Sequence, residues 1–310
     1  MIKSPIGYPG GKFKALNDIM ELVPYGIEDW REPFFGGGSV TIGFLQDIKS
    51  KDCKRFIVGD LYTEMYKFWT GVQKNPNKVI ELVKEWWTDA TALRSELIKY
   101  PTDTKEYKEV YDKIVLEGRK LWAWATSVDC NTLTLEERAA RMYLLNKTSF
   151  SATAEAGSMS LVRTVAFNTE QTKGIADISR VLQRVEIYNT SFENTMANVD
   201  KDKTFIFLDP PYYTQESSGL YGKDGSTHKG FPHKKLADLC DTIECKWLMT
   251  YDDSIFIRQL YNKHNIVPLV LRYSMVGNDT EEDALKGEEV FIANYNISNN
   301  SSFDVLDALI

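Results

Sequence analysis

The ten residues T-F-I-F-L-D-P-P-Y-Y, numbered 204–213, join an apolar run to an aspartate, two prolines and two tyrosines. The apolar run predicts a strand that is buried on both faces, as in a mainly parallel sheet. The prolines stiffen the turn that follows, so Asp209, the neighbouring carbonyls and the Tyr212 ring are exposed at the carboxyl end of the strand. These groups are hydrogen-bond acceptors and a stacking face, and none is a nucleophile. They suit a flat base that carries an exocyclic amine and has left its helical stack.

Other apolar runs along the chain predict further strands of the same sheet. Residues 55–60 (RFIVGD) and 246–253 (KWLMTYDD) also end in carboxylates, and open α/β sheets bind their ligands at this end of the strands. Residues 185–192 and 265–275 add two strands, and residues 288–295 add a last one. Apolar residues at helical spacing follow Lys12, and Pro24 closes this first helix. The pattern predicts an α/β fold.

Residues 71–168 differ in composition from the segments on either side. They are rich in helix-forming residues and hold four of the seven tryptophans, at positions 86, 87, 122 and 124. They predict a separate, mainly helical domain inserted into the α/β core.

The composition limits the class of protein. The chain has 310 residues, of which 43% are hydrophobic and 26% charged, as in ordinary soluble proteins. No stretch approaches the roughly 20 apolar residues of a membrane span, and the first residues lack an apolar signal region, so we expect a cytoplasmic protein. The four cysteines lack CxxC spacing and only three histidines are present, which supports neither a disulfide framework nor a metal site.

The net negative charge of the chain arises from its last 35 residues. The net charge is −7, and residues 276–310 hold eight acidic residues and one lysine. The other 275 residues are therefore neutral, with 36 basic and 36 acidic side chains. A neutral body can carry a basic face, so the net charge does not exclude a nucleic-acid partner.

A glycine-rich turn predicts a cofactor site. In R-E-P-F-F-G-G-G-S-V, residues 31–40, the end of a predicted strand runs into three glycines and then a helix. Glycines at such a turn let the backbone approach a ligand closely, as in nucleotide-binding folds. Asp60 follows some 20 residues later, where an acid can accept hydrogen bonds from a ribose.

A second glycine motif, Y-P-G-G-K at residues 8–12, is not a phosphate-binding loop. A Walker loop has the pattern GxxxxGK[ST], whereas here Ile6 stands five residues before Gly11 and Phe13 follows the lysine. Without a hydroxyl for magnesium, the motif disfavours a nucleoside triphosphatase.

Taken in this order, YPGGK, EPFFGGGSV, the acid at position 60 and DPPYY resemble the Dam-like DNA adenine-N6 methyltransferases, the α-type amino-methyltransferases. The resemblance covers about residues 1–70 and 170–295. It implies a Rossmann-like sheet of seven strands, the last antiparallel, that binds S-adenosylmethionine (AdoMet). It also implies a catalytic domain of residues 1–70 and 169–310, with an inserted target-recognition domain of residues 71–168.

The resemblance implies roles for individual cofactor-binding residues. Tyr8 and Lys12 would hold the methionine end of AdoMet, with Lys12 near its carboxylate. Asp60 would take the ribose hydroxyls. The residues that would line the cleft or flank the adenine are Phe34, Gly36, Gly37, Gly38, Ser191 and Phe192.

The same resemblance assigns the DPPY residues Asp209, Pro210, Pro211 and Tyr212 to catalysis. Asp209 and the carbonyl of Pro210 would accept hydrogen bonds from the target amine, and Tyr212 would stack on a flipped base. An adenine N6 lone pair is delocalised into the ring, so hydrogen bonds that favour a pyramidal nitrogen make it available for direct attack on the sulfonium methyl. Positioning and electrostatics would supply most of the acceleration, with no covalent enzyme intermediate.

Three other functions compete with this one. Cytosine-N4 methylation also modifies an exocyclic amine, although aspartate rather than serine before the prolines favours adenine. A DNA-binding regulator could keep the fold without turnover, but the DPPY residues are intact. A nicotinamide oxidoreductase would use the glycine turn and leave DPPYY unexplained.

Double-stranded DNA is the expected partner, and four cations are candidates for contacting it. Lys223 and Lys229 lie in a glycine-punctuated run, residues 220–231, and Lys147 and Arg163 lie near the end of the insertion. Glu155 stands about where close Dam relatives carry a guanine-reading arginine, so GATC specificity is not predicted. The enzyme would act beside a cognate restriction endonuclease without touching it, or alone.

Overall fold

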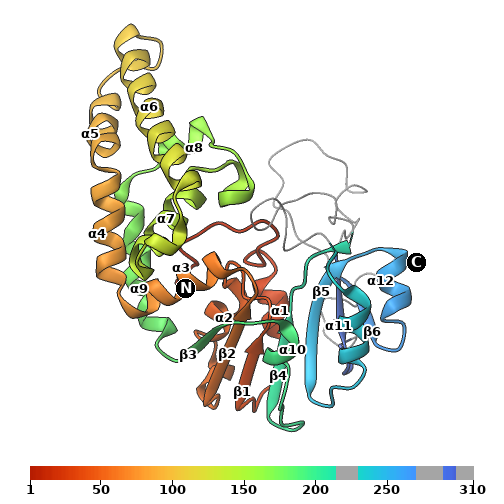
Figure 1. Ribbon diagram of the computed structural model, residues 1–310. Coiled ribbons are helices and arrows are strands. Elements are labelled where there is room, and N and C mark those ends of the chain that lie inside the picture. Colours follow the sequence, from red (N-terminus) through yellow and green to blue (C-terminus); the bar gives the residue numbers. More distant parts are fainter. Residues whose placement is uncertain (214–229, 270–288, 298–310) are drawn as a thin grey trace.

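A computed structural model describes residues 1–213, 230–269 and 289–297 (Figure 1). Its centre is a seven-stranded sheet with the order β3-β2-β1-β4-β5-β7-β6. The strands are β1 (Asp29–Glu32), β2 (Arg55–Asp60), β3 (Val185–Asn189), β4 (Thr204–Leu208), β5 (Lys246–Asp252), β6 (Asn265–Leu269) and β7 (Glu289–Ala293). No helix within these ranges has both the length and the apolar character that crossing a bilayer requires.

The pairing of the strands confirms the predicted sheet. β1 lies between β2 and β4, and β3 and β5 extend this parallel group on either side. Only β7 is antiparallel to its neighbours β5 and β6. Some strands are shorter than predicted: β3 ends at Asn189, before a short helix, and β7 ends at Ala293. Residues 270–275 and 288, which were also predicted as strand, lie outside the described residues.

Helices cover both faces of the sheet, and the alternation of side chains along β4 shows how. Phe205 and Phe207 join one apolar cluster, whereas Ile206 and Leu208 join the other. The first cluster includes side chains of α1 (Leu16–Leu22), α2 (Ser39–Phe44), α3 (Thr63–Lys74) and α9 (Lys173–Leu182). The second includes α10 (Phe192–Thr195), α11 (His233–Cys240) and α12 (Ile255–Leu260).

Five helices separate α3 from α9 in sequence: α4 (Pro76–Trp86), α5 (Thr88–Leu97), α6 (Lys105–Ser127), α7 (Leu135–Thr148) and α8 (Leu161–Ala166). α4, α5 and α6 form an arm that extends away from the sheet (Figure 1). α7 packs on α3 so closely that a Cβ atom on Gly71 would lie 2.6 Å from the Cβ of Ala139. The insertion therefore shares a continuous apolar core with the sheet.

The contact between α3 and α7 predicts opposite effects of alanine at two helical glycines. Gly71→Ala would force the two helices apart and should lower the free energy of unfolding by about 1–3 kcal/mol. Gly174 in α9 meets nothing closer than 4.0 Å, so Gly174→Ala should be neutral or stabilising by up to about 1 kcal/mol. Denaturant unfolding of both variants measures the difference, and equal stabilities would contradict the close packing of α3 on α7.

Candidate active site

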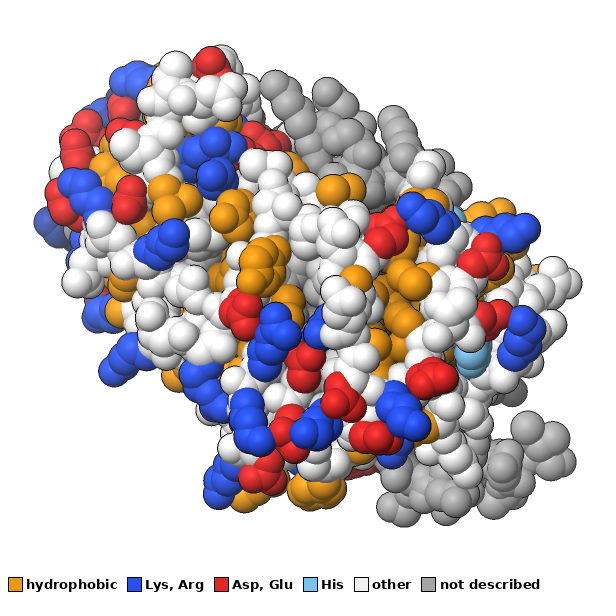
Figure 2. All heavy atoms as spheres, turned by 60° about the horizontal axis from the view of Figure 1, so that its bottom comes forward, with side chains coloured by type: hydrophobic (Ala, Val, Ile, Leu, Met, Phe, Trp, Pro, Cys, Tyr) orange, Lys and Arg blue, Asp and Glu red, His pale blue; other side chains and the backbone are white. Residues whose placement is uncertain are grey.

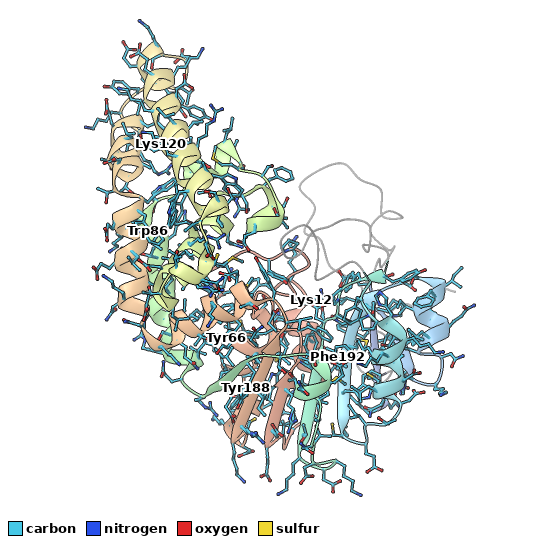
Figure 3. The ribbon with its side chains drawn as sticks, in the orientation of Figure 1. Lys12, Tyr66, Trp86, Lys120, Tyr188 and Phe192 are labelled. Atoms are coloured by element: carbon cyan, nitrogen blue, oxygen red, sulfur yellow. The ribbon has the colours of Figure 1, made fainter. Side chains whose placement is uncertain are left out.

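One cleft of about 290 Å³ collects residues from segments far apart in the sequence. The carboxyl ends of the neighbouring strands β1, β2, β3 and β4 open toward it, as expected for a parallel sheet. Every residue that the sequence assigned to the cofactor or to catalysis lines it: Tyr8, Lys12, Phe34, Gly36, Gly37, Gly38, Asp60, Ser191, Phe192, Asp209, Pro210, Pro211 and Tyr212. Figure 3 shows two of them, Lys12 and Phe192, in the central part of the molecule, with Trp86 and Lys120 on the distant arm.

The glycines after β1 make room for a side chain of the protein. Gly36 has a φ angle of 44°. A Cβ atom there would lie 2.8 Å from the Tyr8 ring, and one on Gly37 would lie 2.5 Å from the Tyr8 Cβ. The sequence predicted close approach of a ligand at this turn, and the structure shows close approach of Tyr8, which itself lines the cleft.

Asp60 holds this turn in place from the end of β2. One carboxylate oxygen accepts a hydrogen bond of 2.8 Å from the Gly36 amide, and the other accepts one of 2.8 Å from the Tyr62 amide. Burial raises the pKa of Asp60 to about 6. Each oxygen has a second lone pair, so the carboxylate can still accept hydrogen bonds from a ligand.

Three phenylalanine rings form an aromatic wall of the cleft. The ring centroids of Phe34 and Phe192 are 5.8 Å apart, and Phe231 lies 5.7 Å from the first and 5.9 Å from the second. Ser191 precedes Phe192 at the start of α10 and also lines the cleft. Such a wall suits a flat heterocycle. Phe231 was not predicted as a site residue, although it ends the run 220–231 that was noted for its cations.

Lys12 pairs with Asp209 on the floor of the cleft. The Lys12 Nζ atom lies 2.9 Å from Asp209 Oδ1 and 3.9 Å from Glu289 Oε2, and the Lys12 side chain is only 5% exposed. Thr250 Oγ1 donates to the same Asp209 oxygen over 2.8 Å. These contacts fix the orientation of the Asp209 carboxylate. The Lys12 Nζ atom also donates to the Gly10 carbonyl over 2.5 Å. The contact of Lys12 with a cofactor carboxylate stays a prediction.

Tyr212 is a buried ring that contacts two other side chains. Its ring centroid lies 4.9 Å from Lys12 Nζ and 6.0 Å from the Tyr251 ring, to which it is nearly parallel. Burial raises the pKa of Tyr212 well above its usual value, which keeps the hydroxyl protonated. The next residue anchors the end of the motif, because the Tyr213 amide donates to Asp252 Oδ1 over 2.7 Å.

Comparison with known proteins identifies the family. Residues 8–275 match the family model of D12 class N6 adenine-specific DNA methyltransferases. The chain belongs to this family. The resemblance inferred from the motifs is thereby confirmed, as is the prediction of an adenine-specific DNA methyltransferase with DNA as its substrate.

Curated relatives of the D12 enzyme match over most of their length. The type II methyltransferase M.MjaIII of Methanocaldococcus jannaschii is 24% identical, over 95% of this chain and 99% of the relative. M.CviBI of Paramecium bursaria Chlorella virus NC1A is 23% identical, over 84% of this chain and 87% of the relative. M1.LlaDCHI of Lactococcus lactis subsp. cremoris is 22% identical, over 84% of each.

Glu32 is an acid of the D12 enzyme that sequence analysis did not select. It ends β1, lines the cleft and accepts hydrogen bonds from the amide and the hydroxyl of Thr41. Burial raises its pKa to about 8. Its position at a strand end, like that of Asp60, was the available signal, but burial could not be inferred from the sequence.

Of the four cations predicted to contact DNA, Lys147 and Arg163 are described, and neither lines the cleft of the D12 enzyme. Arg163 donates to the carbonyls of Asn146 and Lys147 over 3.1 and 3.3 Å, at the end of α7. Burial lowers the pKa of Lys147 to about 8. Lys223 and Lys229 lie outside the described residues. On the face that Figure 2 shows, acidic and basic side chains are interspersed.

The buried Glu32 predicts a pH dependence of stability. The folded chain retains a proton on Glu32 up to a pH of about 8, whereas the unfolded chain releases it near 4.5, so the native free energy of unfolding should fall as pH rises between these values. Glu32→Gln removes this titration. The free energy of unfolding of Glu32→Gln minus that of the native chain should therefore rise by on the order of a few kcal/mol between pH 5 and pH 9. Denaturant unfolding at pH 5, 7 and 9 measures the gain.

The matched control for Glu32 is Glu28→Gln. Glu28 is only partly buried, and its hydrogen bond with Lys54 lowers its pKa, so it is largely ionised in both states throughout this range. The difference in free energy of unfolding between Glu28→Gln and the native chain should therefore be the same at each pH. A constant difference for Glu32→Gln as well would contradict the raised pKa.

Proposed function

We propose that this D12 enzyme transfers the methyl group of AdoMet to N6 of an adenine that is rotated out of duplex DNA into the cleft. One observation carries the proposal. The cleft joins an acidic and aromatic region, around Asp60 and Phe192, to the Asp209–Tyr212 motif without a break. A donor and an acceptor of the methyl group can therefore occupy one cavity.

The residues around Asp60 fit AdoMet. The Asp60 carboxylate offers acceptors for the two ribose hydroxyls, and the wall of Phe34, Phe192 and Phe231 offers a face for the adenine. Tyr8 and the glycine turn would bound the methionine end. When bound, AdoMet supplies a methyl group made electrophilic by its sulfonium.

Asp209 and Pro210 act on the target amine. In the proposed complex, the Asp209 carboxylate and the Pro210 carbonyl each accept one N–H of the amine, which favours a pyramidal nitrogen whose lone pair is available for attack. Lys12 and Thr250 keep Asp209 in this orientation, because both bind Oδ1. This leaves Oδ2 as an acceptor among the described contacts. Such preorganised hydrogen bonds cost no reorganisation during the reaction.

Tyr212 would stack on the extruded base. Its ring lines the cleft and is already held by contacts with Lys12 and Tyr251, so little side-chain freedom is lost when a base packs on it. Stacking on an aromatic side chain contributes about 1–3 kcal/mol per base. This offsets part of the cost of unstacking the adenine.

The insertion, residues 71–168, would recognise the target sequence in duplex DNA. The names of the relatives, which are type II methyltransferases, support a role beside a restriction endonuclease. Lys147, Arg163, Lys223 and Lys229 stay proposed DNA contacts. Arg163 would have to contact DNA while it also donates hydrogen bonds to the carbonyls of Asn146 and Lys147 at the end of α7.

Single-turnover methylation with methyl-labelled AdoMet and duplex DNA tests the proposal. After digestion to nucleosides, the label should appear in N6-methyl-2′-deoxyadenosine. Label in N4-methylcytosine would contradict the choice of base, and DNA binding without any transfer would support the regulator.

Asp209 should be decisive for the rate. Asp209→Ala removes an acceptor needed as the amine becomes nucleophilic, so the single-turnover rate should fall by on the order of 10²-fold or more, with DNA binding largely kept. Asp253→Ala is the matched control, because Asp253 is bonded to Arg258 just beyond β5 and does not line the cleft. Near-native turnover by Asp209→Ala would overturn the proposed mechanism.

A further inference from the structure

The loop from Ser149 to Met159 has no role in the cleft, yet its backbone is tightly specified. A bridge joins its two ends, and the Phe150 amide donates to the Ser158 carbonyl over 2.8 Å. Ser151, Ala152 and Ala154 have φ angles of 49°, 61° and 48°. Residues other than glycine adopt this left-handed conformation only when their surroundings enforce it.

One set of contacts ties the loop to the segment that carries Tyr8. The Asn146 side chain accepts a hydrogen bond of 3.0 Å from the Gly7 amide and donates to the Gly7 carbonyl over 2.7 Å. The same amide group donates to the Ala152 carbonyl over 3.0 Å. A Cβ atom on Gly7 would lie 2.8 Å from the Cβ of Ala152, so the two segments are in direct contact.

A second set ties the loop to the segment that carries Asp60. The Glu155 carboxylate accepts hydrogen bonds from the Tyr62 hydroxyl and from the Arg141 guanidinium. The Tyr62 amide in turn donates to Asp60. Arg141 is 1% exposed and lies 3.7 Å from Glu64, so it is a buried cation held by two acids. The Glu155 side chain is only 9% exposed, so it is not accessible to a ligand on the surface of the loop.

Glu155 thus stands where a base-reading arginine was expected, but its carboxylate binds other residues of the protein. It does not line the cleft, and its two oxygens are used within the protein. Phe150 and Ser151, beside the bridged ends of the same loop, are exposed. The contacts of Glu155 and Asn146 hold the loop that carries them against the segments beside the cleft.

We propose that Glu155 is a positioning residue for target-site selection, which clamps the loop 149–159 to the segment that carries Asp60, beside the contacts of Asn146 with the segment that carries Tyr8, and so couples cofactor binding to DNA reading. The proposal rests on the proposed function, because it takes AdoMet as the ligand near Asp60 and DNA as the ligand at the loop. A ligand that orders the segments carrying Asp60 and Tyr8 favours the clamped conformation of the loop. By thermodynamic linkage, DNA that binds this conformation raises the affinity for the cofactor by the same factor.

Two variants each remove part of the clamp. Tyr62→Phe deletes one hydroxyl, and Glu155→Gln places an amide against Arg141 in place of a charge. The chain also offers a matched pair of controls on the edge strand β3, where the exposed Tyr188 hydroxyl donates to Glu186 over 2.7 Å. Tyr188→Phe and Glu186→Gln make the same chemical changes at two residues that do not line the cleft.

The readout is the choice of site, which a general loss of stability would not change. Unmethylated plasmid DNA is methylated by each variant, and sequencing compares the rate at the principal site with rates at sites that differ by one base. Both clamp variants should lower this discrimination by about tenfold, within the usual range of coupling between two sites. The two controls should match the native enzyme, and the effects of Tyr62→Phe and Glu155→Gln should not add, since they act on one contact.

Binding of S-adenosylhomocysteine, the demethylated product, supplies the second measurement. Duplex containing the principal site should tighten its binding to the native enzyme and should do so much less in Glu155→Gln, whereas binding without DNA is kept. An unchanged site choice in both clamp variants would overturn the proposal. So would an equal loss of binding with and without DNA, because Glu155 would then serve the cofactor pocket alone.

Failure of the proposed function itself would appear in the native enzyme, as methylation of another base or none. Should Glu155→Gln not fold, as thermal unfolding would show, Tyr62→Phe decides, because it keeps every charge of the cluster. Native discrimination by folded Tyr62→Phe would then overturn the clamp.

Discussion

The hydrogen bonds of the Asp60 carboxylate organise the site. Asp60 ends β2, and its two oxygens bind amides on opposite sides, one in the glycine turn after β1 and one in the segment that leads to α3. The turn in turn encloses the Tyr8 ring, since any Cβ atom at Gly36 or Gly37 would collide with it. One carboxylate therefore connects the glycine turn, and with it the Tyr8 ring, to the segment before α3. The parallel order of β1, β2 and β4 makes this possible, because it brings their carboxyl ends to one edge.

The charges of the cleft match a cationic cofactor better than a polyanion. Among the described residues that line it, Lys12 is the single cation, and five residues are acidic: Glu32, Asp60, Glu193, Asp209 and Glu289. AdoMet carries a sulfonium and an amine, so its positive groups suit such a site. These acids repel DNA phosphates, so the floor of the cleft favours an uncharged base over the DNA backbone. The charges therefore favour phosphate contacts outside the cleft.

Much of the fold and the site could be predicted because both depend on local patterns. Apolar runs ending in carboxylates mark the strands, and the motifs at their ends converge wherever a parallel sheet forms. Contacts between distant segments could not be read in this way. Nothing in YPGGK indicates that Lys12 binds Asp209, because that pairing requires the tertiary fold. Likewise, the inward turn of Glu155 depends on Arg141 and Tyr62, which no spacing connects to it. The division into catalytic residues 1–70 and 169–310 and recognition residues 71–168 stays a prediction, and the apolar core runs across it.

Hydrogen exchange of the backbone amides with and without AdoMet tests most directly whether separate segments form one cofactor site. Our account predicts that AdoMet slows exchange in the segments around Tyr8, Gly36, Asp60 and Phe192, all of which line one cleft. The arm formed by α4, α5 and α6 holds a second cavity of about 210 Å³, beside Trp86 and Lys120, and its exchange should not change. Protection confined to that arm, with unchanged exchange around Asp60, would contradict the account.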